Sequence, residues 1–131
     1  MITKFAIAAA ALAFASAPAL AQDVAAGEAV FKRCAACHAV GPNAANKVGP
    51  HLNGVVGRVA GSLPEYNYSE PMKTAGAEGL TWTEQDLHDF LAAPREKVPG
   101  TKMAFAGLKN EEDLANIIAY LATFNAEGAA Q

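Results

Sequence analysis

Apolar residues recur at helical spacing near the end of the chain. Asn110 can cap a helix here, and the acidic residues that follow it suit the positive end of the helix dipole. One face of this helix would carry Leu114, Ile117, Ile118, Leu121 and Phe124. The spacing therefore predicts an amphipathic helix over residues 111–124.

Two further helices are predicted upstream. Residues 24–36 place apolar side chains near helical spacing after a possible cap at Asp23. Gly27 inside this helix costs about 1 kcal/mol relative to alanine, which is reasonable where another element crosses closely. Residues 81–84, Thr-Trp-Thr-Glu, have the capping-box form and open a helix that ends near Ala92, before Pro94.

The segments between these helices lack a regular pattern. Residues 40–70 are dense in Gly, Pro and Asn, and residues 94–108 form a second irregular stretch. A long irregular loop in a small domain becomes reasonable when it wraps a cofactor. We therefore predict an all-α domain with three helices, two long loops and no strand.

The first 21 residues are predicted to be a cleaved signal peptide. Lys4 precedes an apolar run of small residues, and Ala19-Leu20-Ala21 has the small-x-small form that a signal peptidase cuts. The run is short for a membrane span, and the alternative is a retained N-terminal anchor. We expect export through a Sec-type signal and one mature domain over residues 22–131.

The net charge and the size of the mature chain indicate which binding partners to expect. Removal of Lys4 from the 10 basic residues leaves 9 against 13 acidic ones, a net charge of −4. Binding to bulk nucleic acid is therefore not expected. A mature domain this small buries a limited core, so a large cofactor at its centre would contribute to stability.

Both cysteines lie in the motif Cys34-Ala-Ala-Cys37-His38. Cys-x-x-Cys-His is typical of c-type haem attachment. Positions i and i+3 share a helix face, so the two thiols can reach both vinyl groups along one porphyrin edge, and His38 can turn toward the iron. A thioredoxin-like dithiol would expect a βαβ pattern, and a zinc site would need His51 or His88 as further ligands.

The second axial position of such a haem would decide the function. Met103 lies in an irregular segment flanked by Pro and Gly, away from any periodic apolar face, which favours ligation over core packing. Met72 is the rival ligand. A strong sixth ligand favours electron transfer, whereas an open position favours gas binding or peroxide chemistry.

Four motifs in register resemble a class I cytochrome c. They are GEAVFKRCAACH (27–38), KVGPHLNGVVGR (47–58), EGLTW (78–82) and VPGTKMAFAGL (98–108), followed by IIAYL (117–121). The chain is similar to the mitochondrial-like carriers found in the periplasm of photosynthetic and related proteobacteria. The resemblance implies that the N- and C-terminal helices cross, and that shorter helices and long loops wrap one covalently bound haem c.

The resemblance also assigns roles to single residues. It implies that His38 and Met103 are the axial iron ligands and that the Pro50 carbonyl accepts the outer imidazole N–H of His38. Gly27 and Phe31 would face the last helix at Tyr120. The polar hydrogens that would reach the buried haem propionate belong to Arg58, Tyr68, Trp82 and Thr101. A phenylalanine, Phe90, stands where family members commonly have a tyrosine.

The implied function is one-electron transport in the periplasm by a monomer that is not an enzyme. Electrons would pass from ubiquinol–cytochrome c reductase to a cytochrome oxidase or a photosynthetic reaction centre. Docking at the haem edge would use a ring of basic residues, Lys32, Arg33, Lys47, Arg95, Lys97, Lys102 and Lys109. The alternatives are a haem peroxidase or ligand sensor, and a dithiol oxidoreductase.

Overall fold

The computed structural model describes residues 9–12 and 22–131, so most of the predicted signal peptide lies outside the described residues. Its helices are α1 (Val24–Phe31), α2 (Glu70–Ala77), α3 (Glu84–Ala92), α4 (Pro94–Lys97) and α5 (Glu111–Leu121). In the described ranges the only β pairings are two isolated bridges, Val59–Thr81 and Phe124–Ala130. The predicted all-α class is confirmed. None of the helices in these ranges has the length and apolar character that crossing a membrane requires.

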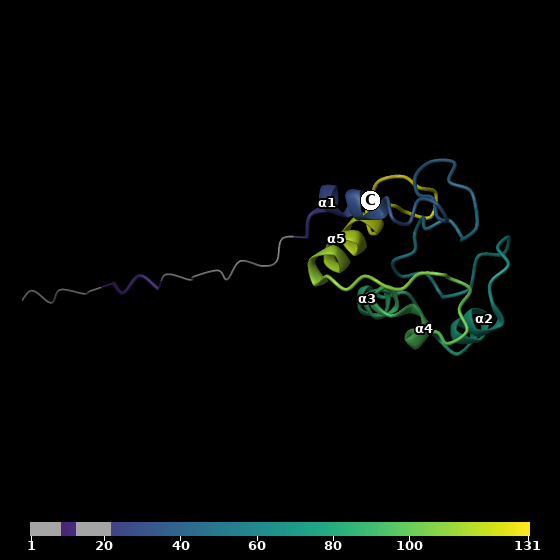
Figure 1. Cartoon of the computed structure of the whole chain (residues 1–131). Helices are drawn as coiled ribbons and strands as arrows, with labels where there is room; N and C mark the ends of the chain where they lie inside the picture. The colour runs from purple at the N-terminus through teal and green to yellow at the C-terminus, as the bar shows by residue number, and fades with distance from the viewer. Residues whose placement is uncertain (1–8, 13–21) are drawn as a thin grey trace, which may run out of the picture.

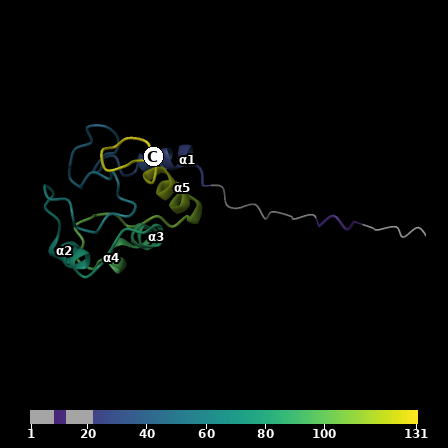
Figure 2. The same ribbon diagram turned by 180° about the vertical axis from the view of Figure 1, so that it is seen from behind.

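The helices form two groups. Figure 1 shows α1 and α5 side by side, whereas α2, α3 and α4 lie at the opposite side of the domain. Figure 2 shows the same arrangement from behind. Long loops join the two groups. This arrangement agrees with the expectation that irregular segments make up much of the domain.

Helix α1 begins where predicted and ends earlier. The Asp23 side chain accepts a hydrogen bond from the Ala26 amide at 3.0 Å, which caps the helix. The α-helix ends at Phe31, short of the predicted end at residue 36, and the chain continues in turns. Backbone bonds from Cys34 to Phe31 at 2.7 Å and from His38 to Cys34 at 2.9 Å keep these turns tight.

Helix α5 agrees with its predicted start and buried face. The Asn110 side chain accepts hydrogen bonds from the amides of Glu112 and Asp113 at 2.9 and 3.1 Å. The helix ends at Leu121 and continues as a turn to Phe124, so the predicted end at residue 124 was wrong by less than one helical turn. The buried apolar residues are Leu114, Ile117, Ile118 and Leu121.

The terminal helices cross at Gly27. A Cβ placed on this glycine would lie 2.7 Å from both the Tyr120 Cβ and the Asn116 carbonyl carbon, so only glycine allows the observed approach. Phe31 packs against Tyr120 with ring centroids 5.6 Å apart. The buried Asn116 side chain also accepts a hydrogen bond from the Asp23 amide at 2.9 Å. The predicted crossing of the first and last helices is confirmed.

Helix α3 was predicted with the wrong cap. Thr83, not Thr81, accepts the capping hydrogen bond from the Asp86 amide at 3.1 Å. Thr81 instead pairs with Val59 in an isolated bridge. Because the chain before α3 is extended and bonded to another segment, the helix starts two residues later than the capping-box pattern alone indicates.

Two helices were missed, so the prediction of three helices was incomplete. Helix α2 follows the cap Ser69, whose hydroxyl accepts a bond from the Met72 amide at 3.2 Å, and it has Pro71 in its first turn. Helix α4 is a single turn that begins at Pro94. The proline that ends α3 therefore also starts the next helix.

Candidate functional site

The Cys-x-x-Cys-His turn is held against the loop of residues 39–54, which we call the proximal loop. The Gly49 amide donates to the Cys37 carbonyl at 2.8 Å. His38 Nδ1 lies 2.7 Å from the Pro50 carbonyl oxygen. A Cβ on Gly49 would lie 2.5 Å from Cε1 of His38, so the imidazole lies flat against the glycine backbone. These contacts fix the orientation of the ring.

The tautomer of His38 follows from its partner. A carbonyl oxygen only accepts hydrogen bonds, so Nδ1 carries the proton and Nε2 keeps its lone pair. Burial lowers the pKa of His38, despite the opposing effect of the Pro50 bond, so the ring is neutral at pH 7. A neutral imidazole with a free Nε2 lone pair is the form that binds a metal.

The two cysteines are half-buried and are not joined to each other by a disulfide. Burial raises the pKa of the Cys34 thiol. Reactive dithiols depend on a lowered thiol pKa, so this environment argues against the dithiol alternative. For the zinc alternative, no cluster of three or more His, Cys, Asp or Glu side chains suited to a metal occurs within residues 9–12 and 22–131.

A short extended pairing brings Arg58 beside Trp82. The Trp82 amide donates to the Arg58 carbonyl at 2.8 Å, and the Gly57 amide donates to the Trp82 carbonyl at 2.7 Å. Trp82 is buried and packs against Phe90 with ring centroids 4.9 Å apart. Two of the residues predicted to surround the propionate thus lie on neighbouring segments.

The Arg58 guanidinium has a buried donor without a partner. Its terminal nitrogen Nη1 donates to the carbonyls of His51 and Asn53 at 3.2 and 3.1 Å. Its Nε is the one buried side-chain nitrogen or oxygen in the described residues without a hydrogen-bond partner. Burial also lowers the pKa of Arg58, so an anion would stabilise its charge. A carboxylate fits this donor, and a haem propionate is such a group.

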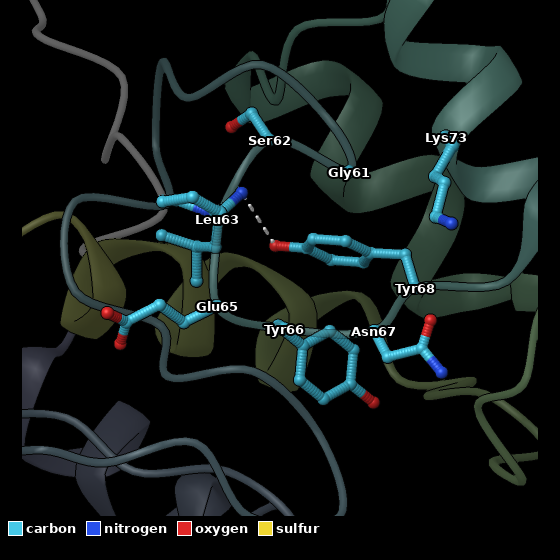
Figure 3. A pocket seen from close by; sticks show the side chains of 9 residues that line it. Gly61, Ser62, Leu63, Glu65, Tyr66, Asn67, Tyr68 and Lys73 are labelled. Atoms are coloured by element: carbon cyan, nitrogen blue, oxygen red, sulfur yellow. Dashed lines mark hydrogen bonds between the residues drawn. The ribbon is translucent and has the colours of Figure 1, made fainter.

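Tyr68 is a buried residue of the loop before α2. Interaction with Tyr68 partly opposes the lowering of the Arg58 pKa by burial. Figure 3 shows the Tyr68 hydroxyl pointing to the Leu63 amide, from which it accepts a hydrogen bond at 3.3 Å. The Tyr66 ring lies edge-on to Tyr68, with centroids 4.8 Å apart. Together these residues line a surface pocket between residues 61–68 and Lys73.

The two candidate methionines have different surroundings. Met72, on α2, is 9% exposed and belongs to the main apolar core. Met103 is half-buried in the irregular segment between α4 and α5 and packs at the edge of that core. The Thr101 hydroxyl accepts a weak hydrogen bond from the Met103 amide at 3.4 Å, and within the described residues no hydrogen bond joins Thr101 to Arg58 or Tyr68. Core packing explains Met72 and leaves Met103 as the better candidate ligand.

The seven basic residues expected at the haem edge differ in their pairing with acids. Lys97 bonds to Asp86 at 2.8 Å and lies 3.9 Å from Asp89, and Arg33 lies 3.7 Å from Asp113, so both are paired with acids. No ion pair within the described residues involves the other five, Lys32, Lys47, Arg95, Lys102 and Lys109.

Two lysines among these five basic residues are anchored close to the candidate site. Lys47 Nζ donates to the carbonyl of Ala35, between the two cysteines, at 2.8 Å. Lys102 Nζ, next to Met103, donates to the Asn67 carbonyl at 2.9 Å. Positive charge therefore stands beside both the cysteine turn and the methionine segment.

Sequence reasoning missed Asn53. This buried side chain accepts from the Gly41 amide and donates to the Gly41 carbonyl, both at 2.9 Å, and so ties the two ends of the proximal loop together. An asparagine in a Gly- and Pro-rich loop was visible in the sequence, but its partner lies 12 residues away and no local pattern identifies it.

A cytochrome c family model matches residues 24–125, and the chain belongs to this family. The chain is 65% identical over 99 residues to cytochrome c2 of Agrobacterium tumefaciens (strain II Chrys), a match that covers 76% of this chain and 89% of the relative. It is 55% identical over 105 residues to cytochrome c2 of Afifella marina, which covers 80% and 85% of the two chains.

Solved structures show the same fold. Cytochrome c2 from Rhodospirillum centenum matches with a TM-score of 0.73 and 44% identity, covering 79% of this chain and 98% of that one. Cytochrome cH from Methylobacterium extorquens matches with a TM-score of 0.70 and 47% identity, covering 77% and 98%. The chain therefore has the class I cytochrome c fold, as the sequence resemblance implied.

Family membership settles the class of function. The chain is a cytochrome c, an electron carrier and not an enzyme, and its cofactor is covalently attached haem c with its iron. Cys34 and Cys37 are the only two cysteines in the chain and so the only side chains that can form the thioethers. The half-buried cysteines, the neutral His38 and the unpaired Arg58 donor fit this group.

Proposed function

We propose that the chain is a periplasmic one-electron carrier whose iron is bound by His38 and Met103. The observation that carries this proposal is the hydrogen bond from His38 Nδ1 to the Pro50 carbonyl, which leaves a neutral ring with Nε2 free to bind a metal. The different surroundings of Met103 and Met72 support the choice of the second ligand. When bound, haem c supplies the one-electron couple of its iron.

The residues of the chain tune and protect this couple. The Pro50 carbonyl accepts the His38 proton, which raises the basicity of the imidazole. Arg58 Nε offers a buried donor to a propionate, Trp82 lies on the segment paired with Arg58, and both Trp82 and Tyr68 are buried. His38 and Met103 together would leave no position on the iron open to a substrate, which suits electron transfer.

We further propose that the carrier takes electrons from ubiquinol–cytochrome c reductase and passes them to a cytochrome oxidase or photosynthetic reaction centre. The lysines anchored beside the cysteine turn and the methionine segment support docking to an acidic patch. Because the whole chain has a net negative charge, this local positive charge would orient the protein so that this side faces an acidic partner.

Two measurements on the purified protein test this function. A pyridine haemochrome spectrum should show a haem c bound through two thioethers, and the native reduced protein should not bind carbon monoxide. Rapid carbon monoxide binding would favour the ligand sensor or peroxidase alternative. A colourless protein with two alkylatable thiols would contradict haem attachment altogether.

A further inference from the structure

The last nine residues form a closed turn, which we call the C-terminal tail (residues 123–131). The Asn125 side chain accepts hydrogen bonds from the amides of Glu127 at 3.0 Å and Ala129 at 2.9 Å. The Asn125 amide donates to the Ala129 carbonyl at 2.9 Å, and Gln131 donates to the Thr123 carbonyl at 3.0 Å. The tail is therefore an ordered element with its own hydrogen bonds.

The C-terminal tail docks on the proximal loop. In Figures 1 and 2 the yellow end of the chain lies beside the blue loop that follows α1. The Gly54 amide donates to the Phe124 carbonyl at 3.2 Å, and a Cβ on Gly54 would lie 3.0 Å from the Ala126 Cα. A Cβ on Gly128 would lie 2.7 Å from Asn53 Nδ2 and closer still to the Gly41 carbonyl oxygen. Backbone thus packs on backbone with no space for a side chain.

The loop that the tail contacts is bonded internally. Asn53 bonds to both backbone groups of Gly41 at 2.9 Å, and the Leu52 amide donates to the Ala39 carbonyl at 2.9 Å. Gly128 packs on this Asn53–Gly41 pair from outside. The tail therefore covers the hydrogen bonds that close the proximal loop.

The closed loop in turn positions His38. Pro50 lies three residues before Asn53, and its carbonyl accepts the His38 Nδ1 proton at 2.7 Å. We propose that the C-terminal tail is a positioning element for His38, which holds the Pro50 carbonyl in place by clamping the proximal loop at Gly41, Asn53 and Gly54. This inference rests on the proposed role of His38 as an iron ligand.

Gly128→Ala tests the clamp, and Gly79→Ala is its matched control. Both glycines have positive φ, +81° and +105°, so alanine strains the backbone at either site. At Gly79 an added Cβ meets nothing within 4 Å, whereas at Gly128 it meets the Asn53–Gly41 pair. The difference between the two variants therefore isolates the contact between tail and loop. Asn125→Ala, which removes bonds inside the tail without adding atoms, is a second and milder variant.

The measurements are amide hydrogen exchange and reduction potential of the haem-loaded protein. Exchange at the Gly41 and Gly54 amides should be at least about tenfold faster in Gly128→Ala than in Gly79→Ala. The reason is that the loss of one buried hydrogen bond raises the equilibrium constant for local opening by about tenfold. The potential should rise in Gly128→Ala and stay at the wild-type value in Gly79→Ala, because a weaker bond to Pro50 makes His38 a poorer donor to the iron. Asn125→Ala should shift both readouts in the same direction by less.

Each contrary outcome has a distinct meaning. Equal exchange rates and equal potentials in Gly128→Ala and Gly79→Ala, in protein that carries haem, would overturn the clamp and leave the proposed function intact. Faster exchange with an unchanged potential would show that the tail stabilises the loop without positioning His38, which also overturns the proposal. A wild-type preparation without haem would instead overturn the proposed function.

Discussion

The crossing of α1 and α5 at Gly27 gives a quantitative prediction for Gly27→Ala. The added Cβ would lie 2.7 Å from the Tyr120 Cβ and the Asn116 carbonyl carbon, and closer still to the Asn116 carbonyl oxygen, well short of the 3.4 Å at which contact becomes ordinary. The neighbours are a backbone carbonyl and a Cβ, which cannot rotate away, so the helices must separate. We place the overpacking cost near the upper end of the usual range, about 3 kcal/mol. Alanine recovers about 1 kcal/mol through its better helix propensity.

The expected result is a net loss of about 2 kcal/mol in the free energy of unfolding. Guanidinium chloride unfolding of the haem-loaded protein, followed by far-ultraviolet circular dichroism, measures it as a lower midpoint at unchanged slope. Ala29→Gly, at an exposed position of the same helix, calibrates the propensity and should cost about 1 kcal/mol. A Gly27→Ala midpoint equal to or above the wild-type value would refute the tight crossing.

Three further predictions concern charge. A hydrogen bond to Glu111, and a weaker effect of a second one to Asp89, raise the pKa of His88. The protonated His88 therefore stabilises the folded protein fully below pH 6.5, and this stabilisation is lost as the pH rises through the raised pKa. His88→Gln should therefore lower the free energy of unfolding by roughly 0.5 kcal/mol in acid and by nothing in alkali; a loss that is the same at both pH values would contradict the ion pair. Arg58→Ala should cost about 2 kcal/mol or more because it removes a buried charged donor, and an unchanged unfolding midpoint would exclude the proposed propionate contact. The second-order rate of electron transfer to a membrane redox complex should fall steeply as salt is raised, and a rate independent of ionic strength would rule out docking through the lysines.

Helices with a periodic apolar face and a clear cap could be predicted from the sequence. Asn110 and the apolar residues from Leu114 to Leu121 determine α5, and Asp23 determines the start of α1. Gly27 even predicted a tertiary contact, because a glycine in a helix is costly unless another backbone needs the space. The caps and apolar faces depend on residues close in sequence, and the crossing is indicated by Gly27, a residue that disfavours helix.

The missed features depend on contacts that no local pattern records. Helix α2 is short and carries few apolar residues, and the Ser69 cap followed by Pro71 was its one local signal. The shift of the α3 cap from Thr81 to Thr83 arises because Thr81 pairs with Val59. The bonds of Asn53 and the docking of Gly128 join segments that are distant along the chain.

Some residues of the candidate site could likewise be predicted from a local motif, and others could not. The haem-attachment motif identified Cys34, Cys37 and His38 from residue type and spacing alone. The irregular, Pro- and Gly-flanked surroundings of Met103 made it the candidate sixth ligand, with Met72 as its rival. The roles expected for Pro50 and Arg58 required the resemblance to a family, because their distances from the motif along the chain follow no general rule. The unpaired Nε of Arg58 could only be found in three dimensions, since it depends on what surrounds a buried side chain.

The most direct test of the proposed ligation is the absorption spectrum of the oxidised protein in three forms, wild type, Met103→Ala and the control Met72→Ala. The charge-transfer band between sulfur and iron should be present in the wild type and in Met72→Ala, and absent from Met103→Ala. Survival of the band in Met103→Ala, or its loss in Met72→Ala alone, would contradict a His38–Met103 iron centre.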